Sequence, residues 1–375
     1  MSKKIIWLIV AIVIVGGLII WQQKNIQPKT DKQAVKIGVL IPLTGTRAEG
    51  GRYDKNGLEL ALAEINNDKS KKYQVNLVYE DTQYDPKLAV TSFNKLTNLD
   101  KVNYVIGPHG SSEVLAVAPI AEQNKIILIT PAAQSTDITK AGDYIFRTQI
   151  NISQEVPFLA DFIYSQAQNE PVHLMLLNTE YGSSFLANYK PYYERLGGKI
   201  GLVEKYETTS TDFRSQLTKI KEQNPQYIYL ATLPKQGAMI IKQSKELGIK
   251  AKFFATAPVE GKELLEIGKQ AVEGLIYSYP YDEESDNVVM KKYRENYQAK
   301  YNEANEMYSA SFYDTLHILS NCLEKVGDNI ESVKTCLYET QNYQGASGLL
   351  SFDKNGDLSK PFIFKTVKDG QFVKY

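Results

Sequence analysis

Residues 103–112 of the chain, Asn-Tyr-Val-Ile-Gly-Pro-His-Gly-Ser-Ser, are the stretch that decides the fold. A short apolar, β-rich run ends in glycine and proline, and the helical pattern of residues 111–124 begins at once. A buried strand followed directly by a helix is the repeating unit of α/β proteins with parallel sheets. This stretch therefore predicts a parallel sheet flanked by helices.

The same unit recurs along the chain in two tandem sets. Short β-rich runs predict strands at 35–41, 74–80, 104–107 and 126–130 in the first set, and at 172–178, 199–206, 227–231 and 252–255 in the second. Helical patterns lie between and after these runs, at 51–68, 85–99, 111–124, 151–168, 182–196, 212–223, 235–247, 286–302 and 306–326. This order predicts two α/β blocks, each with a doubly wound parallel sheet.

The C-terminal part breaks the alternation. Residues 349–352 and 362–367 predict a β-hairpin, joined by the segment 353–357, Asp-Lys-Asn-Gly-Asp. That segment is similar to a calcium loop but lacks the glutamate that closes one, so a glycine-containing hairpin turn is favoured.

Length and composition are those of an ordinary globular chain. The 375 residues predict two compact units or one bilobed one, and 43% hydrophobic with 23% charged residues argue against disorder. Forty-three basic residues balance 43 acidic ones, a formal charge of zero. The basic surplus that phosphate-backbone binding requires is absent, so no nucleic-acid partner is expected.

The N-terminus has the pattern of an export segment. Residues 5–23 carry no charge, follow Lys3 and Lys4, and contain a tryptophan near each end of the apolar run. This pattern predicts a signal sequence or a signal anchor. With no A-x-A cleavage site and no nearby cysteine for a lipid, an uncleaved anchor over 1–24 and a linker over 25–34 are favoured. The body is expected on the extracytoplasmic face of the membrane, or in the periplasm or medium if the segment is cut; a buried core helix is the alternative.

Cys322 and Cys336 are the only cysteines. They are too few for a disulfide scaffold and wrongly spaced for a zinc site. If the body is exported they can pair and close a loop of about 15 residues, worth roughly 3 kcal/mol of stability. Two buried free thiols are the equal alternative.

Sequence motifs for catalysis and cofactors are missing. The chain has no phosphate-binding loop, dinucleotide fingerprint, nucleophile elbow, H-E-x-x-H or C-x-x-C motif. His109, His173 and His317 lie far apart in the sequence, so packed or solvated histidines are favoured over a metal cluster. No enzyme, cofactor or metal is expected.

One candidate anion site remains. Ser111 and Ser112 follow a glycine at the start of the helix 111–124, where hydroxyls, free N–H groups and the helix dipole suit a carboxylate. A simple N-cap serine is the alternative. The strand 126–130 ends in a second polar loop, 131–136, and ligands of open α/β sheets bind at the carboxyl ends of strands.

These loops belong to an ordered set of motifs. They are 35–45 (VKIGVLIPLTG), 56–66 (NGLELALAEIN), 80–87 (EDTQYDPK), 105–112 (VIGPHGSS), 129–133 (ITPAA), 180–182 (EYG), 309–314 (SASFYD) and 348–353 (GLLSFD). From about residue 35 to the C-terminus, the chain resembles the periplasmic substrate-binding proteins of branched-chain amino-acid ABC transporters.

The resemblance implies a type I periplasmic binding protein: two α/β lobes joined by three hinge crossings. The first lobe is expected over 35–147 and 279–345, and the second over 148–278 and 346–375. A small-molecule ligand is expected in the cleft, where hinge closure creates the surface that the permease subunits recognise. A membrane-tethered sensory ectodomain that binds the same kind of ligand is the alternative function.

The resemblance also implies roles for single residues. Ser111 matches the serine that binds the ligand carboxylate, and the backbone of Ala132 matches a second contact. Tyr181 matches an aromatic wall of the second lobe, and Tyr308 falls where the family often has an aromatic. Gln134 stands where a threonine that contacts the head group is usual.

Three positions depart from the family pattern. The acid that pairs with a ligand ammonium would fall at Ala257, and Glu260 could replace it only after a loop shift. Leu233 and Gly50 replace aromatics of the branched-chain amino-acid binders. Because a buried ammonium without a carboxylate is costly, these changes leave an amino acid, an amide, a carboxylic acid and a peptide-like solute open as ligand.

Overall fold

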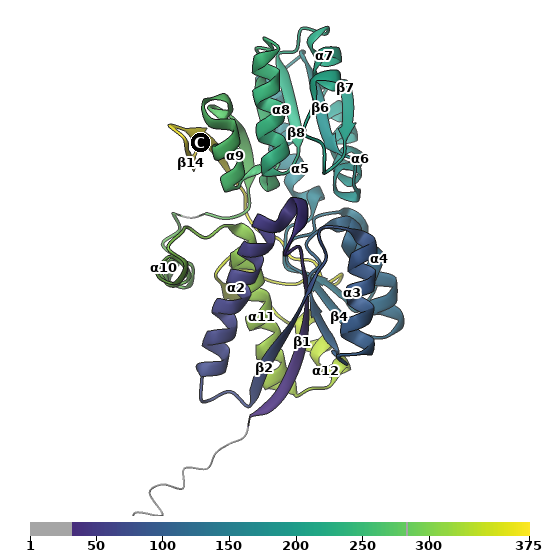
Figure 1. Cartoon of the computed structure of the whole chain (residues 1–375), viewed down its shortest axis with the longest axis vertical. Helices are drawn as coiled ribbons and strands as arrows, with labels where there is room; N and C mark the ends of the chain where they lie inside the picture. The colour runs from purple at the N-terminus through teal and green to yellow at the C-terminus, as the bar shows by residue number, and fades with distance from the viewer. Residues whose placement is uncertain (1–31, 283) are drawn as a thin grey trace, which may run out of the picture.

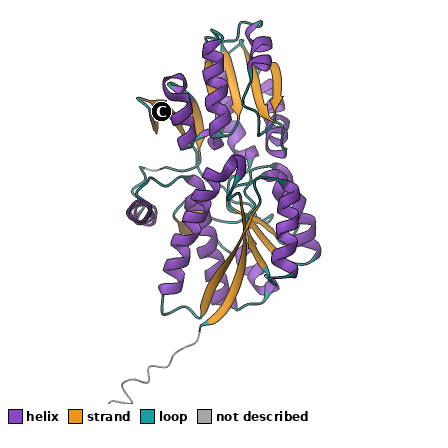
Figure 2. Cartoon of the chain, in the orientation of Figure 1, coloured by secondary structure: helices purple, strands orange, loops and turns teal. Residues whose placement is uncertain are grey.

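The structure, a computed structural model, describes residues 32–282 and 284–375, which form two lobes with separate sheets (Figure 1). The first lobe lies at the bottom of the view and the second at the top, and helices flank both sheets (Figure 2). The predicted α/β fold of two parallel-sheet lobes with three crossings is confirmed. The predicted anchor over 1–24 lies outside the described residues.

The sheet of the first lobe is entirely parallel, with the strand order β2-β1-β3-β4-β5. Its strands are β1 (Gln33–Ile41), β2 (Tyr73–Asp81), β3 (Tyr104–Ile106), β4 (Ile127–Thr130) and β5 (Ile145–Arg147). Its helices are α2 (Ala48–Asn67), α3 (Pro86–Asn98), α4 (Ser111–Gln123), α11 (Met307–Val326) and α12 (Ile330–Tyr338). Helices α2 and α11 pack together on one face, and α3 and α4 on the other (Figure 1).

The sheet of the second lobe has the order β14-β13-β10-β9-β8-β6-β7 and is parallel from β10 to β7. Its strands are β6 (Pro171–Leu177), β7 (Lys199–Tyr206), β8 (Tyr227–Ala231), β9 (Lys252–Ala255), β10 (Ile276–Tyr279), β13 (Ile363–Lys368) and β14 (Gln371–Lys374). Its helices are α5 (Ile152–Ala167), α6 (Glu180–Arg195), α7 (Arg214–Lys221), α8 (Pro234–Glu246) and α9 (Lys262–Gly268). The last two strands add an antiparallel edge.

The quoted stretch 103–112 folds as the sequence predicts. All three residues of β3 are buried, with at most 1% of each exposed. The strand pairs in parallel with both β1 and β4, and α4 begins at Ser111. A strand with neighbours on both sides and helices on both faces must be apolar throughout, which explains the run Tyr-Val-Ile.

The predicted C-terminal hairpin is wrong. Strand β12 (Gly348–Leu350) pairs with β11 (Tyr343–Gly345), whereas β13 pairs with β10 and β14. Gly348 has a φ of +120°, which permits the tight turn between β11 and β12. Both segments are strands, as their apolar alternation predicts. The partner of each strand, however, depends on contacts with residues distant in sequence.

Residues 346–358 remain on the first lobe, although the sequence assigned them to the second. Asp357 pairs with the buried Arg147 at 2.6 Å and makes a parallel bridge beside β5. Phe352 packs edge-on against Phe146, with ring centroids 5.7 Å apart. The third crossing therefore comes later than position 345–348, because this buried ion pair and the aromatic contact hold the segment to the first sheet.

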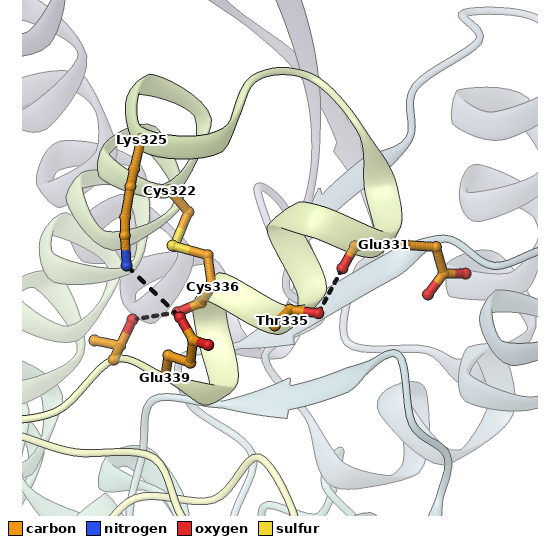
Figure 3. Close-up of a disulfide and its surroundings, with 7 residues drawn as sticks. Cys322, Lys325, Glu331, Thr335, Cys336 and Glu339 are labelled. Atoms are coloured by element: carbon orange, nitrogen blue, oxygen red, sulfur yellow. Dashed lines mark hydrogen bonds and ion pairs between the residues drawn. A yellow bond between two sulfur atoms is a disulfide. The ribbon is translucent and has the colours of Figure 1, made fainter.

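Cys322 and Cys336 form a disulfide that ties α11 to α12 (Figure 3). Lys325 and Glu339 make an ion pair of 3.6 Å beside it. Of the two states that the sequence left open, the structure has the disulfide. The sequence did not predict α12 itself.

Helix α10 (Val288–Tyr301) packs beside α2 on the first lobe. Across residues 32–282 and 284–375, no helix combines the length and apolar character that crossing a membrane needs.

Candidate ligand-binding site

A small cavity lies where the loops of the two lobes meet. Its volume is about 20 Å³, which is room for a single water molecule. The first lobe contributes Tyr84, His109, Ser111, Ala132, Ala133, Gln134 and Tyr308, and the second contributes Tyr181, Leu233 and Pro258. Five residues expected from the sequence therefore surround one space: Ser111, Ala132, Gln134, Tyr181 and Tyr308.

Ser111 is the first residue of α4, and its hydroxyl joins two loops. Its Oγ accepts hydrogen bonds from the backbone N–H of Gln134 at 3.2 Å and of Ser135 at 3.1 Å. The hydroxyl proton has no acceptor among the described residues, so it is free to donate. A hydroxyl held in this way at a helix N-terminus suits a ligand carboxylate.

The second loop, 131–136, is fixed by Thr130. The Oγ1 of Thr130 donates to the carbonyl of Pro108 at 2.8 Å and accepts from the N–H of Ala133 at 3.2 Å. Gln134 is 1% exposed, and neither atom of its amide group has a partner in the part of the chain that the structure describes. Because an unpaired buried amide is costly, Gln134 is a candidate for ligand contact.

The wall from the second lobe is mainly apolar and aromatic. Tyr181 lies in the first turn of α6, and its hydroxyl donates to the Oγ1 of Thr256 at 2.6 Å. Leu233 precedes α8, and Pro258 lies in the short 3₁₀ helix Ala257–Val259. This wall can cover a ligand but offers it few hydrogen bonds.

Ala257 itself carries no acid, but a carboxyl group lies against its backbone. Glu155 of α5 is fully buried, and its Oε1 accepts from the N–H of Ala257 at 2.9 Å and from the hydroxyl of Ser278. Its Oε2 has no partner among the described residues. Burial raises the pKa of Glu155 to about 7. An acid thus reaches the loop at position 257 from a different element.

Glu260 is engaged elsewhere. Its carboxylate forms an ion pair with Lys365 at 2.9 Å and accepts from the hydroxyl of Tyr277, both on neighbouring strands of the second sheet. It also lines a separate groove of about 880 Å³ beside α9 and α10. Glu260 therefore does not stand in for an acid at Ala257.

A chain of buried polar groups leads to the other side of the cavity. Asp54 of α2 holds Nδ1 of His109 at 2.7 Å, and Nε of Arg47 donates to Nε2 of His109 at 3.3 Å. Burial, with the charge of Arg47, lowers the pKa of His109 well below its usual range. Because Nε2 accepts the hydrogen bond from Arg47, the ring carries its proton on Nδ1, toward Asp54.

Gly50 makes room for this arrangement. A Cβ atom at position 50 would lie 2.6 Å from Nε and 2.8 Å from Cζ of Arg47. The guanidinium also lies over the ring of Tyr308, 5.4 Å from its centroid. Arg47 thus occupies the space beside Gly50, the position at which the sequence lacks the family's aromatic residue.

The lobes touch each other at the mouth of the cleft. The Oγ of Ser112 accepts from the N–H of Glu180 at 3.1 Å. Ser184 Oγ accepts from the N–H of Thr136 at 2.9 Å and lies 3.0 Å from its Oγ1. Ser112 lines a neighbouring cavity of about 220 Å³ rather than the small one. These bonds hold the cleft closed.

Metal chemistry has no candidate in the described ranges, where no three His, Cys, Asp or Glu side chains could hold an ion. His173 Nδ1 accepts from the N–H of Leu202 at 3.1 Å, and His317 lies 3.5 Å from Glu64. Neither histidine lines the cavity.

Sequence reasoning missed His109, which lines the cavity, and the two buried charged groups behind it, Arg47 and Glu155. Glu155 did carry a signal, because it shares the buried face of α5 with Ile152 and Leu159. An acid on the apolar face of a helix needs a polar partner, which points to a site. Arg47 had no comparable signal, since its burial depends on the glycine three residues later.

The sequence profile described as "Periplasmic binding protein" matches residues 34–371 of the chain. The leucine-, isoleucine-, valine-, threonine- and alanine-binding protein of Pseudomonas aeruginosa is 27% identical over 340 residues, which is 88% of each chain.

Solved structures agree with the fold. A leucine binding protein from Thermotoga maritima superimposes with a TM-score of 0.86 at 29% identity, covering 91% of this chain and 97% of its own. A solute binding protein of an ABC transporter from Rhodopseudomonas palustris, solved with 3,4-dihydroxybenzoic acid, gives 0.83 at 22% identity, with 91% and 95% covered.

Proposed function

The chain belongs to the periplasmic binding protein family, and from that premise we propose that it captures an amino acid between its lobes for an ABC importer. One observation carries the proposal. Ser111 and the loop 131–136 of the first lobe meet Tyr181 and Pro258 of the second around a single cavity. The closed cavity has room for one water only, so a ligand must enter with the lobes apart; once between them it touches both lobes, and its binding favours their closure.

The head group is bound by the first lobe in this proposal. The hydroxyl of Ser111 already accepts hydrogen bonds from two backbone N–H groups, and it donates a hydrogen bond to the ligand carboxylate. The N–H groups at the start of α4 and the amide of Gln134 add further donors. Tyr181 and Leu233 then cover the ligand from the second lobe.

The ammonium of the amino acid is assigned to Glu155. This carboxyl group lies against the backbone of Ala257 and has one oxygen without a partner among the described residues. A buried ammonium requires such an acid. The curated relative is named for binding leucine, isoleucine, valine, threonine and alanine, which supports the amino-acid class.

Delivery requires a location outside the cytoplasm. The apolar segment 5–23 serves as an export signal and membrane anchor in this proposal and keeps the body beside the permease. Closure of the lobes then creates the surface that the permease recognises.

The test is ligand binding by the full chain in mild detergent, after copurified ligand has been removed and its absence checked by mass spectrometry. We expect titration calorimetry to detect binding of at least one of the three amino acids among four probes, L-leucine, L-glutamine, L-glutamate and glutarate, and binding of glutarate alone would contradict the amino-acid class. Ser111→Ala should weaken that binding by about 1–3 kcal/mol, because a hydrogen bond to a charged group is lost.

Ser165→Ala is the matched control, since its hydroxyl donates to the carbonyl of Phe162 on the surface of α5. This variant should bind like the wild type. Absence of binding by all four probes would overturn the proposal, and unchanged affinity in Ser111→Ala would remove Ser111 from the site.

A further inference from the structure

We propose that Arg47 binds a second anionic group on the ligand, so that the cleft selects an amino acid with an acidic side chain. The inference rests on the proposed function and names its ligand class. It begins from a guanidinium in the interior of the protein, beside the cavity and away from the serine that receives the head group.

Arg47 has no acid partner of its own. It is 6% exposed, it forms no ion pair with any described residue, and its one hydrogen bond there is to His109. Asp54 and Glu306 act on it electrostatically from a distance. Asp54 is bonded to His109, and Glu306 accepts from the backbone N–H groups at the start of α11. Burial disfavours the charged guanidinium, but the surrounding tyrosines and acids outweigh it and raise the pKa of Arg47, so the group stays charged although no described carboxylate contacts it.

The remaining donors of Arg47 are held in place. The Oδ2 of Asp54 accepts a hydrogen bond from Nδ1–H of His109, which leaves Nε2 to accept from Nε of Arg47. The ring of Tyr308 lies under the guanidinium, with 5.4 Å between Cζ and the centroid. These contacts use one N–H and one face of the group. The two Nη atoms are left for a carboxylate, which an arginine can bind in a bidentate manner.

Arg47 does not line the cavity itself but contacts two residues that do. His109 and Tyr308, the two residues that Arg47 contacts, both line the cavity with Ser111. Gly50 leaves the space that Arg47 fills, because any Cβ there would lie within 2.8 Å of the guanidinium. A large apolar wall would suit a leucine side chain, whereas this protein has a cation behind His109 and Tyr308.

The ligand class follows from three groups, of which Ser111 lines the cavity while Glu155 and Arg47 lie behind residues of its walls. Ser111 suits an α-carboxylate, Glu155 suits an α-ammonium, and Arg47 suits an anion on the side chain. A small dicarboxylic amino acid such as glutamate or aspartate carries these three groups. Leucine would leave the guanidinium buried without an anion.

The experiment compares L-glutamate with L-glutamine, which has the same shape and no side-chain charge, by calorimetry on the full chain. The wild type should bind glutamate at least about tenfold more tightly, because only glutamate supplies a charged partner for the guanidinium. Arg47→Gln should abolish this preference. Arg52→Gln is the control, since Arg52 lies on the surface of α2 and pairs with Glu303.

The outcomes separate the two proposals. If no probe binds, the proposed function fails. If glutamine or leucine binds the wild type as tightly as glutamate, the function stands and the assignment to Arg47 is wrong. Retained preference for glutamate in Arg47→Gln would equally overturn it. The wild-type comparison decides the question even if the variant does not fold.

Discussion

The two walls of the cleft differ in chemistry. The wall from the first lobe presents Ser111, Gln134 and the network that ends in Arg47, whereas the wall from the second presents Tyr181 and Leu233. The first wall is already hydrogen-bonded into position, so it can recognise a ligand before the lobes close. The second wall covers the ligand and supplies a single acid, Glu155, from behind. Recognition and closure are thus assigned to different lobes.

The largest expected effect concerns the single acid of the second wall. Burial raises the pKa of Glu155 to about 7, from an ordinary value of 4.5. Between these values the unfolded chain loses the proton while the folded chain keeps it, so this group contributes stability at low pH that is lost as pH rises toward 7. Glu155→Gln should remove that dependence, worth about 3 kcal/mol.

Urea unfolding of wild type and Glu155→Gln at pH 4 and pH 8 measures this effect. The wild type should gain about 3 kcal/mol relative to the variant at the lower pH. The phenols of Tyr181, Tyr229 and Tyr308 face this carboxyl group, and burial raises their pKa well above 10, so they do not titrate in this range. If the difference in unfolding free energy between wild type and Glu155→Gln were the same at both pH values, the raised pKa of Glu155 would be contradicted.

The next largest effect is expected from Gly50→Ala, which tests whether ligand affinity depends on the position of Arg47. A methyl group in Gly50→Ala would meet the end of the flexible Arg47 side chain and displace it. Glutamate affinity should fall about tenfold, close to 1.4 kcal/mol, with little change in the unfolding free energy. Calorimetry and thermal unfolding on the same preparation measure both quantities. Unchanged glutamate affinity would mean that the position of Arg47 does not matter.

The smallest effect concerns the contact between the two walls. Ser184→Ala removes the hydrogen bonds to the N–H and hydroxyl of Thr136 across the cleft. Closure should weaken by about 1 kcal/mol, seen as a severalfold higher Kd. Ser183→Ala is the control, because no hydrogen bond of the Ser183 side chain exists among the described residues. Equal Kd values for both variants would remove this contact from the closing step.

The contrast between the walls also explains what the sequence could predict. Local pattern was sufficient for the βα units, and for Ser111, which directly follows a strand and a glycine. The partners of β12 and β13 could not be predicted. The apolar pattern is the same whether these strands pair with each other or, as in the structure, β12 pairs with β11 and β13 pairs with β10 and β14. Glu155 and Arg47 depend on contacts over long separations: Glu155 meets Ala257 about 100 residues later, and Arg47 meets His109.

The central claim is that the cleft beside Ser111 and Arg47 is the ligand site, and a crystal structure of the full chain with L-glutamate tests it most directly. The account predicts the α-carboxylate about 2.5–3.0 Å from the Oγ of Ser111, and the side-chain carboxylate against the Nη atoms of Arg47. Glutamate seated instead in the groove beside Glu260 and Arg294, with the cleft residues unengaged, would contradict it.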